Sequence, residues 1–325
     1  MILPYTLRLL CLCFASFFLI HAALGLAVWT ATPGAMRIGE SMRPRSGVRF
    51  LLALRLLPVT LAAFVVAGLC VPSYLWLETN EATERVGLAC CAMALLGVLV
   101  CASSLARSVR ALFLSARQAR RCKREGRSDR ESDSVPVTVM NSDAPVLALA
   151  GLIRPRVIVS RAVLQTLSRE ELEAALEHEH AHRKSQDNLK RLLLFLAPDI
   201  LPFSRAFTRL NQYWARLIEW AADDEATEGD SARSVALAAA LVRMARIGSA
   251  AAVSPLASSF LGNDRELSAR VDRLLGFAPI RRNVSRRARA VLTTAAALAM
   301  TLALAAMIRP ATFLSVHHLL EQLLR

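Results

Sequence analysis

Histidine and glutamate residues near the middle of the chain have the types and spacing of a metal-binding site. The run Glu177–His182 reads Glu-His-Glu-His-Ala-His. In a helix, His178 and His182 lie one turn apart on one face, with Glu179 beside them. Two imidazole nitrogens at this spacing can bind one ion, so we expect His178 and His182 to share a metal.

The chemistry expected from this spacing is hydrolysis by a zinc-activated water. A catalytic zinc ion takes three protein ligands and leaves a fourth position open. Glu179 lies near that position, where it can take a proton from the attacking water and pass it to the leaving amine. His180 is two residues from either ligand and therefore points away from the metal. We interpret His180 as solvated or packed.

A third ligand is expected further along the chain. No cysteine follows Cys122, so this ligand must be a histidine or a carboxylate. Glu219 and Asp223 are four residues apart in a predicted helix over residues 204–226, and they project from one face. We predict that Glu219 is the third metal ligand and that Asp223 accepts the outer N–H of a ligating histidine. The alternative is that both are surface charges.

A small sheet and a capped helix are predicted to position these residues. Residues 135–140 and 145–151 are apolar, β-branched runs that favour a hairpin, and residues 156–160 make a further strand. The edge formed by the last two runs is a place where an extended substrate can add to the sheet, although a purely structural role is equally compatible. Ser168 and Glu171 have the capping-box pattern, which predicts the start of the metal-binding helix.

The composition indicates membrane helices. Hydrophobic residues make up 54% of the 325 residues, and the mean hydropathy is +0.39, which is high for a soluble protein. Four uncharged stretches are long enough to cross a bilayer: 9–29, 56–77, 86–106 and 290–308. The first is too long and too uniformly apolar for a typical signal peptide, so we interpret it as a retained helix.

The basic residues predict the orientation. The loop after the first span carries arginines at 37, 43, 45 and 49, whereas the loop after the second is mainly acidic. Basic runs follow the third span and precede the fourth, so residues 107–289 should lie in the cytoplasm and both termini outside. This distribution also accounts for the net charge of +14. No nucleic-acid motif or interleaved aromatic residue accompanies it, so we expect no direct nucleic-acid binding.

These observations together predict five segments. They are three membrane helices within residues 1–114, a basic cytoplasmic linker or frayed helix extension at 115–134, a zinc peptidase domain at 135–283, a fourth membrane helix at 290–308, and a short extracytoplasmic tail at 309–325 containing an amphipathic helix.

The motifs resemble a known family. His178-Glu179-x-x-His182, followed by Glu219-x-x-Ala222-Asp223, is similar to the gluzincin metallopeptidases, in which such a glutamate is the third zinc ligand. The order of spans and zinc domain resembles the BlaR/MecR-type sensor-transducer peptidases. Local matches lie at residues 151–159, 183–189 and 270–275. The resemblance implies a mainly α protein with four transmembrane helices and a cytoplasmic α+β zincin-like domain that binds Zn²⁺.

The resemblance also implies a function in signalling. A multi-pass zinc endopeptidase of the bacterial inner membrane would cleave itself or a cytoplasmic protein substrate such as a winged-helix transcriptional repressor. Those receptors carry a large penicillin-binding sensor domain after the last span, whereas only residues 309–325 follow here. We therefore do not expect β-lactam sensing. The sequence leaves open the oligomeric state and the group that stabilises the transition state, for which Arg216 and Tyr213 are candidates.

Two alternatives belong to other classes. A prenyl-protein or membrane-quality-control zinc protease would share the Glu-x-x-Ala-Asp pattern. A degenerate membrane receptor without enzymatic activity would be expected to lose at least one motif residue, and none is lost.

Overall fold

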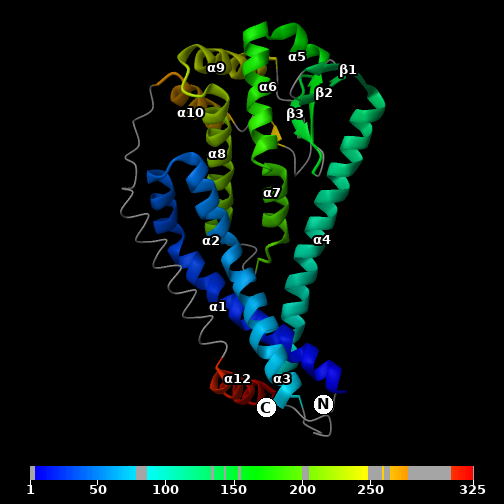
Figure 1. Cartoon of the computed structure of the whole chain (residues 1–325), viewed down its shortest axis with the longest axis vertical. Helices are drawn as coiled ribbons and strands as arrows, with labels where there is room; N and C mark the ends of the chain where they lie inside the picture. Colours follow the sequence, from blue (N-terminus) through cyan, green and yellow to red (C-terminus); the bar gives the residue numbers. More distant parts are fainter. Residues whose placement is uncertain are drawn as a thin grey trace.

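Long apolar helices form one end of the molecule, and a small sheet surrounded by helices forms the other (Figure 1). The structure is a computed structural model. It describes residues 4–77, 86–132, 135–142, 144–152, 155–199, 205–247, 258–259, 264–276 and 309–324.

Three helical stretches are long and apolar enough to cross a membrane, and they coincide with three of the four expected spans. They are Tyr5–Ser41 (α1), Pro44–Leu77, and Leu88–Arg121, which belongs to the longer helix α4 (Leu88–Glu125). The fourth expected span, at 290–308, lies outside the described residues.

The second stretch contains a local change of helix type. It consists of α2 (Pro44–Val65), a π-helical turn η1 (Val66–Cys70) and α3 (Val71–Leu77). Pro72 lacks the N–H that would bind the carbonyl four residues earlier, and its ring needs extra space in the preceding turn. The wider π-helical turn directly before it supplies that space, so the helix continues.

The expected linker or helix extension at 115–134 contains regular secondary structure. Helix α4 continues to Glu125, and strand β1 follows at Gly126–Ser132. β1 pairs antiparallel with β2 (Val135–Met140), with an irregularity in register between Arg127 and Arg130. The sheet therefore begins before residue 135.

The predicted hairpin of residues 135–140 and 145–151 is also wrong. The strand order is β1-β2-β4-β3-β5, so β4 (Arg156–Ser160) lies between β2 and β3 (Leu147–Ala150). β2 pairs with β4 in parallel, and β3 pairs with β4 antiparallel. The last four residues of β4 are all buried, which suits a central strand. The only segment paired with the outer side of β3 in the described structure is β5 (Ser258–Ser259).

The remaining helices of the described structure begin after β4. They are α5 (Arg161–Thr166), α6 (Arg169–Lys184), α7 (Asp187–Leu196), α8 (Arg205–Thr227), α9 (Ser231–Arg246), α10 (Asp264–Leu274) and α12 (Pro310–Leu324). The predicted capping box of α6 is confirmed: the Glu171 carboxylate accepts from the Ser168 backbone N–H at 2.9 Å, and the Ser168 hydroxyl accepts from the Glu171 N–H at 3.3 Å.

Two apolar cores hold α6 and α8 in place. The first lies between the sheet, α6 and α9 and includes Val157, Val159 and Leu241. The second joins α8 to α1 and α2. In this second core α2 and α8 approach so closely that a Cβ added at Gly47 would lie 2.8 Å from Cδ1 of Leu217. Helix α8 is thus packed directly against the membrane helices.

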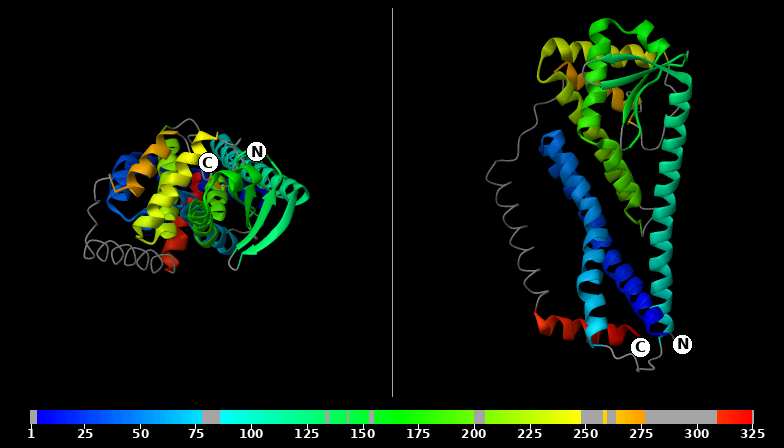
Figure 2. Two further views of the ribbon diagram at one scale, coloured as in Figure 1. Left: turned by 90° about the horizontal axis from the view of Figure 1, so that it is seen from above. Right: turned by 45° about the vertical axis from the view of Figure 1, so that its right-hand side comes forward.

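Helix α7 connects the two ends of the molecule. It follows α6 and runs between α2 and α4, contacting both (Figures 1 and 2). The start of α1 and helix α12 lie together at the end opposite the sheet (Figure 2). The two ends of the chain therefore lie at the same end of the molecule.

Candidate metal centre

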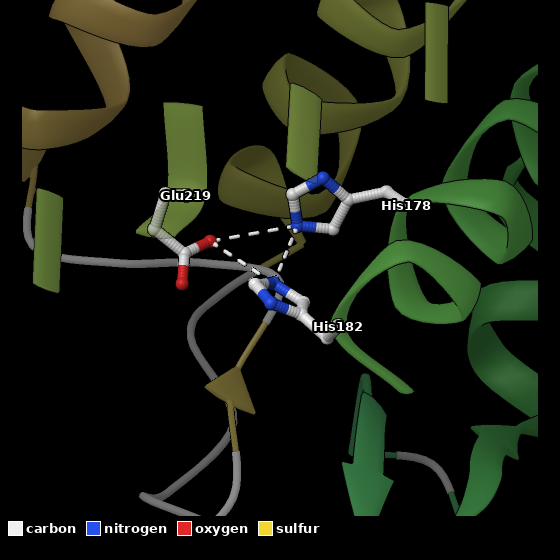
Figure 3. A group of neighbouring side chains, drawn as sticks. All are labelled: His178, His182 and Glu219. Carbon is white, nitrogen blue, oxygen red and sulfur yellow. Dashed lines mark hydrogen bonds and ion pairs between the residues drawn. The ribbon is translucent and has the colours of Figure 1, made fainter. Parts of the chain in front are cut away.

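Three buried side chains from two helices converge on one point. His178 and His182 come from α6 and Glu219 comes from α8, and they point toward one another (Figure 3). The Nε2 atoms of the two histidines are 3.1 Å apart. Glu219 Oε2 lies 3.5 Å from Nε2 of His178 and 3.6 Å from Nε2 of His182. One ligand atom from each residue lies within 4.8 Å of the others, as a shared metal ion requires.

The donor set fits zinc. Two imidazole nitrogens and one carboxylate oxygen form a three-ligand set of the kind found in catalytic zinc sites, which leaves one position open. Both histidines are completely buried, with 0% exposure. Glu219 Oε2 faces both Nε2 atoms and accepts no hydrogen bond within the described residues, although Arg270 Nη1 lies 3.3 Å away. A cation at this point would satisfy all three atoms.

The outer nitrogen of each histidine contacts a carboxylate. His178 Nδ1 lies 3.0 Å from Asp223 Oδ1, and His182 Nδ1 lies 2.8 Å from Asp187 Oδ2. Each carboxylate favours a proton on Nδ1, so that the Nε2 lone pair is directed at the metal position. The contact of Asp223 is the one predicted from the sequence. Asp187 was not identified as a site residue.

The geometry of the α6–α7 turn explains why Asp187 was missed. Gln186 has a left-handed backbone with φ of 54°, which separates α6 from α7. Asp187 is the first residue of the next helix and is therefore not on a face predicted by the periodicity of α6. The only sequence feature that could have pointed to Asp187 was its position five residues after His182, within the segment that resembles the family. Spacing across a turn does not predict a contact.

Glu179 is buried next to the triad. Its side chain is 0% exposed, and neither carboxylate oxygen has a hydrogen-bond partner within the part of the chain that the structure describes. Burial raises its pKa to about 7, against the opposing effect of the histidine charges. An unpartnered carboxylate with this pKa can exchange a proton near neutral pH, as a general base must. His180 is only half-buried and is not part of the metal-binding group.

Arg270 of α10 is a further residue at the centre that the sequence did not single out as functional. Its side chain is 1% exposed. Its Nε and Nη2 donate to the two oxygens of Asp223 at 2.9 and 2.6 Å. Burial alone would raise the pKa of Asp223, but Arg270 and His178 lower it to about 2. Asp223 is therefore ionised, and Arg270 is its counter-charge.

Neither residue considered for transition-state stabilisation lies at the centre. Tyr213 is buried in the core shared by α1, α2 and α8. Arg216 is half-buried on α8 and makes no hydrogen bond or ion pair with the triad among the described residues.

A cavity of about 370 Å³ borders one side of the centre. It lies between the α6–α7 turn and strands β3 and β4, and its lining includes His182, Asp187 and Leu149. Asn188 holds this region together, because its Nδ2 donates to the carbonyl oxygens of Leu149 at 3.3 Å and Gly151 at 2.8 Å. The arrangement places a concave surface beside a candidate metal ligand.

The chain belongs to a peptidase family. The family model described as BlaR1 peptidase M56 matches residues 75–274, which is more than half of the chain. The match includes α6, α8 and α10, the helices that contribute the metal centre. Peptidases of this family are metal-dependent and membrane-bound, in agreement with the triad and the three apolar helices. A search of curated proteins gave no match.

Proposed function

We propose that the protein is a zinc endopeptidase anchored in a bacterial inner membrane, with its catalytic domain, a zincin-like fold, in the cytoplasm. The observation that carries this proposal is the convergence of His178, His182 and Glu219 beside a buried carboxylate, Glu179. Membership of a metal-dependent peptidase family and three apolar helices support it. The basic residues flanking those helices support the cytoplasmic orientation.

Each residue has a defined part in the proposed reaction. His178, His182 and Glu219 hold the ion, while Asp223 and Asp187 orient the imidazoles. When bound, zinc supplies a Lewis acid that polarises the substrate carbonyl and makes water a better nucleophile at neutral pH.

Glu179 then performs the proton transfers of peptide hydrolysis. Its carboxylate takes a proton from the water as the water oxygen bonds to the carbonyl carbon. It gives that proton to the leaving nitrogen as the C–N bond breaks. The burial of Glu179 keeps its basicity close to that required near neutral pH.

The substrate proposed is a cytoplasmic protein, such as a winged-helix repressor, the chain itself, or both. Self-cleavage is supported by the pairing of Ser258 and Ser259 with the outer side of β3. β3 contacts α6, the helix that carries the two histidines. A peptide segment added to the edge of a sheet is a common way to bind an extended substrate, and here a segment of the same chain occupies that edge.

The roles of the motif residues can be separated with the full-length protein in detergent. Glu179→Gln should retain zinc and lose at least about 100-fold in cleavage rate, because only the proton carrier is removed. His178→Ala should lose the metal itself. His180→Ala is the matched control on the same helix and should retain both. Zinc content is measured by elemental analysis. Normal cleavage by Glu179→Gln, or absence of zinc from the wild-type protein, would refute the proposed function.

The substrate class needs a separate experiment. New protein N-termini should be compared in cells expressing the wild-type chain or Glu179→Gln. A repressor peptidase gives one or a few wild-type-specific cleavages, whereas a prenyl-protein or quality-control protease gives cleavages in many membrane proteins. A wild-type-specific N-terminus next to Ser258–Ser259 would establish self-cleavage there. An intact chain after activation would exclude it.

A further inference from the structure

We propose that Arg270 is a positioning residue of the metal centre, which fixes His178 and Glu219 in the geometry that zinc requires. This inference rests on the proposed zinc peptidase function. Arg270 belongs to α10, whereas His178 is in α6 and Glu219 in α8. One buried guanidinium therefore contacts both helices that carry the metal ligands.

The contacts of the guanidinium form two sets. On one side, Nε and Nη2 bind the two oxygens of Asp223, at 2.9 and 2.6 Å, in the fork geometry that is specific to arginine. On the other side, Nη1 lies 3.3 Å from Glu219 Oε2 and Nη2 lies 3.4 Å from His178 Nε2. Arg270 thus holds the carboxylate that orients one ligand and also contacts another ligand directly.

These contacts favour a positioning role over a catalytic one. All three nitrogens of the guanidinium are directed at Asp223, Glu219 or His178, and the side chain is 1% exposed. A group that stabilises a transition state needs a donor directed at the substrate. Arg270 has its donors directed at the metal-binding residues instead.

Whether loss of Arg270 strengthens or weakens metal binding tests the proposal. A positive charge so close to the ion opposes metal binding, so a purely Coulombic role predicts tighter binding when the charge is removed. In the positioning role, loss of Arg270 removes the two hydrogen bonds that hold the Asp223 carboxylate in place, 3.0 Å from His178 Nδ1. His178 loses its orienting acceptor, and the metal binds more weakly.

Arg273 provides a matched control. It lies one turn further along α10, binds Asp224 of α8 and also donates to the carbonyl oxygen of Trp220 at 3.4 Å. Arg270 and Arg273 therefore both attach α10 to α8. Arg273 is more exposed, at 22%, and none of its contacts in the described structure involves the triad. If substitution of Arg270 lowers zinc affinity and substitution of Arg273 does not, the loss arises at the metal centre and not from weaker packing of α10 on α8.

The experiment measures metal binding by the full-length protein in detergent. Zinc affinity is obtained by competition with a chelator, and ligand geometry from the visible absorption spectrum of the Co²⁺-substituted protein. Arg270→Gln should bind zinc about 10-fold to 100-fold more weakly and have an altered Co²⁺ spectrum. Arg273→Gln should keep the affinity within about 2-fold and the wild-type spectrum.

A conservative variant tests whether the fork geometry matters. Arg270→Lys keeps the charge but cannot bind both oxygens of Asp223 in parallel, so it should recover only part of the affinity. Full recovery in Arg270→Lys would overturn the positioning role, as would unchanged or tighter zinc binding by Arg270→Gln or an equal loss in Arg273→Gln. If the wild-type protein binds no zinc, the proposed function itself fails. That result is distinct from failure of the role of Arg270.

Discussion

The two ends of α7 contact two clusters of buried charge that differ in how completely they are shielded from solvent. At its start, Asp187 binds His182 in the metal centre. Just beyond its end, Asp199 binds Arg55 of α2 and lies 3.6 Å from Arg107 of α4. Asp223 and Arg270 of the first cluster are 0% and 1% exposed, whereas the side chain of Asp199 in the second is 24% exposed.

This difference indicates different roles. In the metal centre, carboxylates outnumber arginines: Glu179, Asp187, Glu219 and Asp223 lie around the two histidines, against Arg270 and Arg191, which suits the binding of a cation. The second cluster contains two arginines around one carboxylate and joins two membrane helices to the segment after α7. His21 of α1 adds a third helix, because its Nε2 lies 3.2 Å from the carbonyl oxygen of Pro198. We infer that the first cluster serves chemistry and the second holds the two ends of the molecule together.

The largest effect on stability is expected from Asp199→Ala. Arg55 is only 3% exposed, so removal of its partner leaves a buried charge unpaired, at a cost of about 3 kcal/mol. The thermal unfolding midpoint in detergent should fall, while zinc affinity should change by less than about 2-fold.

Arg107→Ala is the appropriate comparison for that variant. Arg107 is 38% exposed and contacts the same carboxylate from a greater distance, so its removal should cost less than removal of Asp199. An equal effect of the two variants, or a loss of zinc affinity in Asp199→Ala, would contradict the assignment of separate roles to the clusters.

The sequence predicted the local parts of the metal centre. His178, Glu179 and His182 lie within one helical turn, and Glu219 and Asp223 within another, so the helical period alone brings each set together. The capping box of α6 was predictable for the same reason. The contacts that were missed join helices far apart in sequence: Arg270 with Asp223, and Arg55 with Asp199. No local pattern specifies such pairs.

The errors in the sheet have a related cause. Apolar, β-branched runs marked β2, β3 and β4 correctly, but they did not specify which strands pair. In the structure β4 takes the central position and separates β2 from β3. The charged segment from Gly126 to Ser132 was interpreted as a linker because its composition is polar. Its pairing with β2 is formed by backbone groups, which composition does not report.

A smaller effect, confined to the metal centre, is expected from Asp187→Asn. The substitution keeps an acceptor for His182 Nδ1 but removes the negative charge that makes the imidazole a stronger ligand. Zinc affinity should fall by about 10-fold with little change in the unfolding midpoint, the reverse of the result expected for Asp199→Ala. Lys190→Ala is the control, because Lys190 contacts the other oxygen of Asp187 at 2.7 Å and is partly exposed. An equal loss of zinc affinity in both variants would indicate a general disturbance of the turn.

The smallest effect is expected from Arg45→Ala, at an ionic contact between α2 and α8. Arg45 of α2 lies 3.0 Å from Glu225 of α8, which also binds Lys184 at the end of α6. The side chain of Arg45 is 53% exposed and that of Glu225 is 29% exposed, so solvent and salt screen the pair. The cost should be no more than about 0.5 kcal/mol and should vanish in about 1 M salt.

The comparison with Asp199→Ala makes the Arg45 variant informative. Both contacts join the same two ends of the molecule, and they differ mainly in burial. If burial determines their contribution, the midpoint difference for Asp199→Ala persists in high salt, whereas that for Arg45→Ala disappears. If Arg45→Ala lowers the unfolding midpoint as much as Asp199→Ala, the attachment of the metal-binding helices to the membrane helices depends on the number of ionic contacts rather than on their shielding from water.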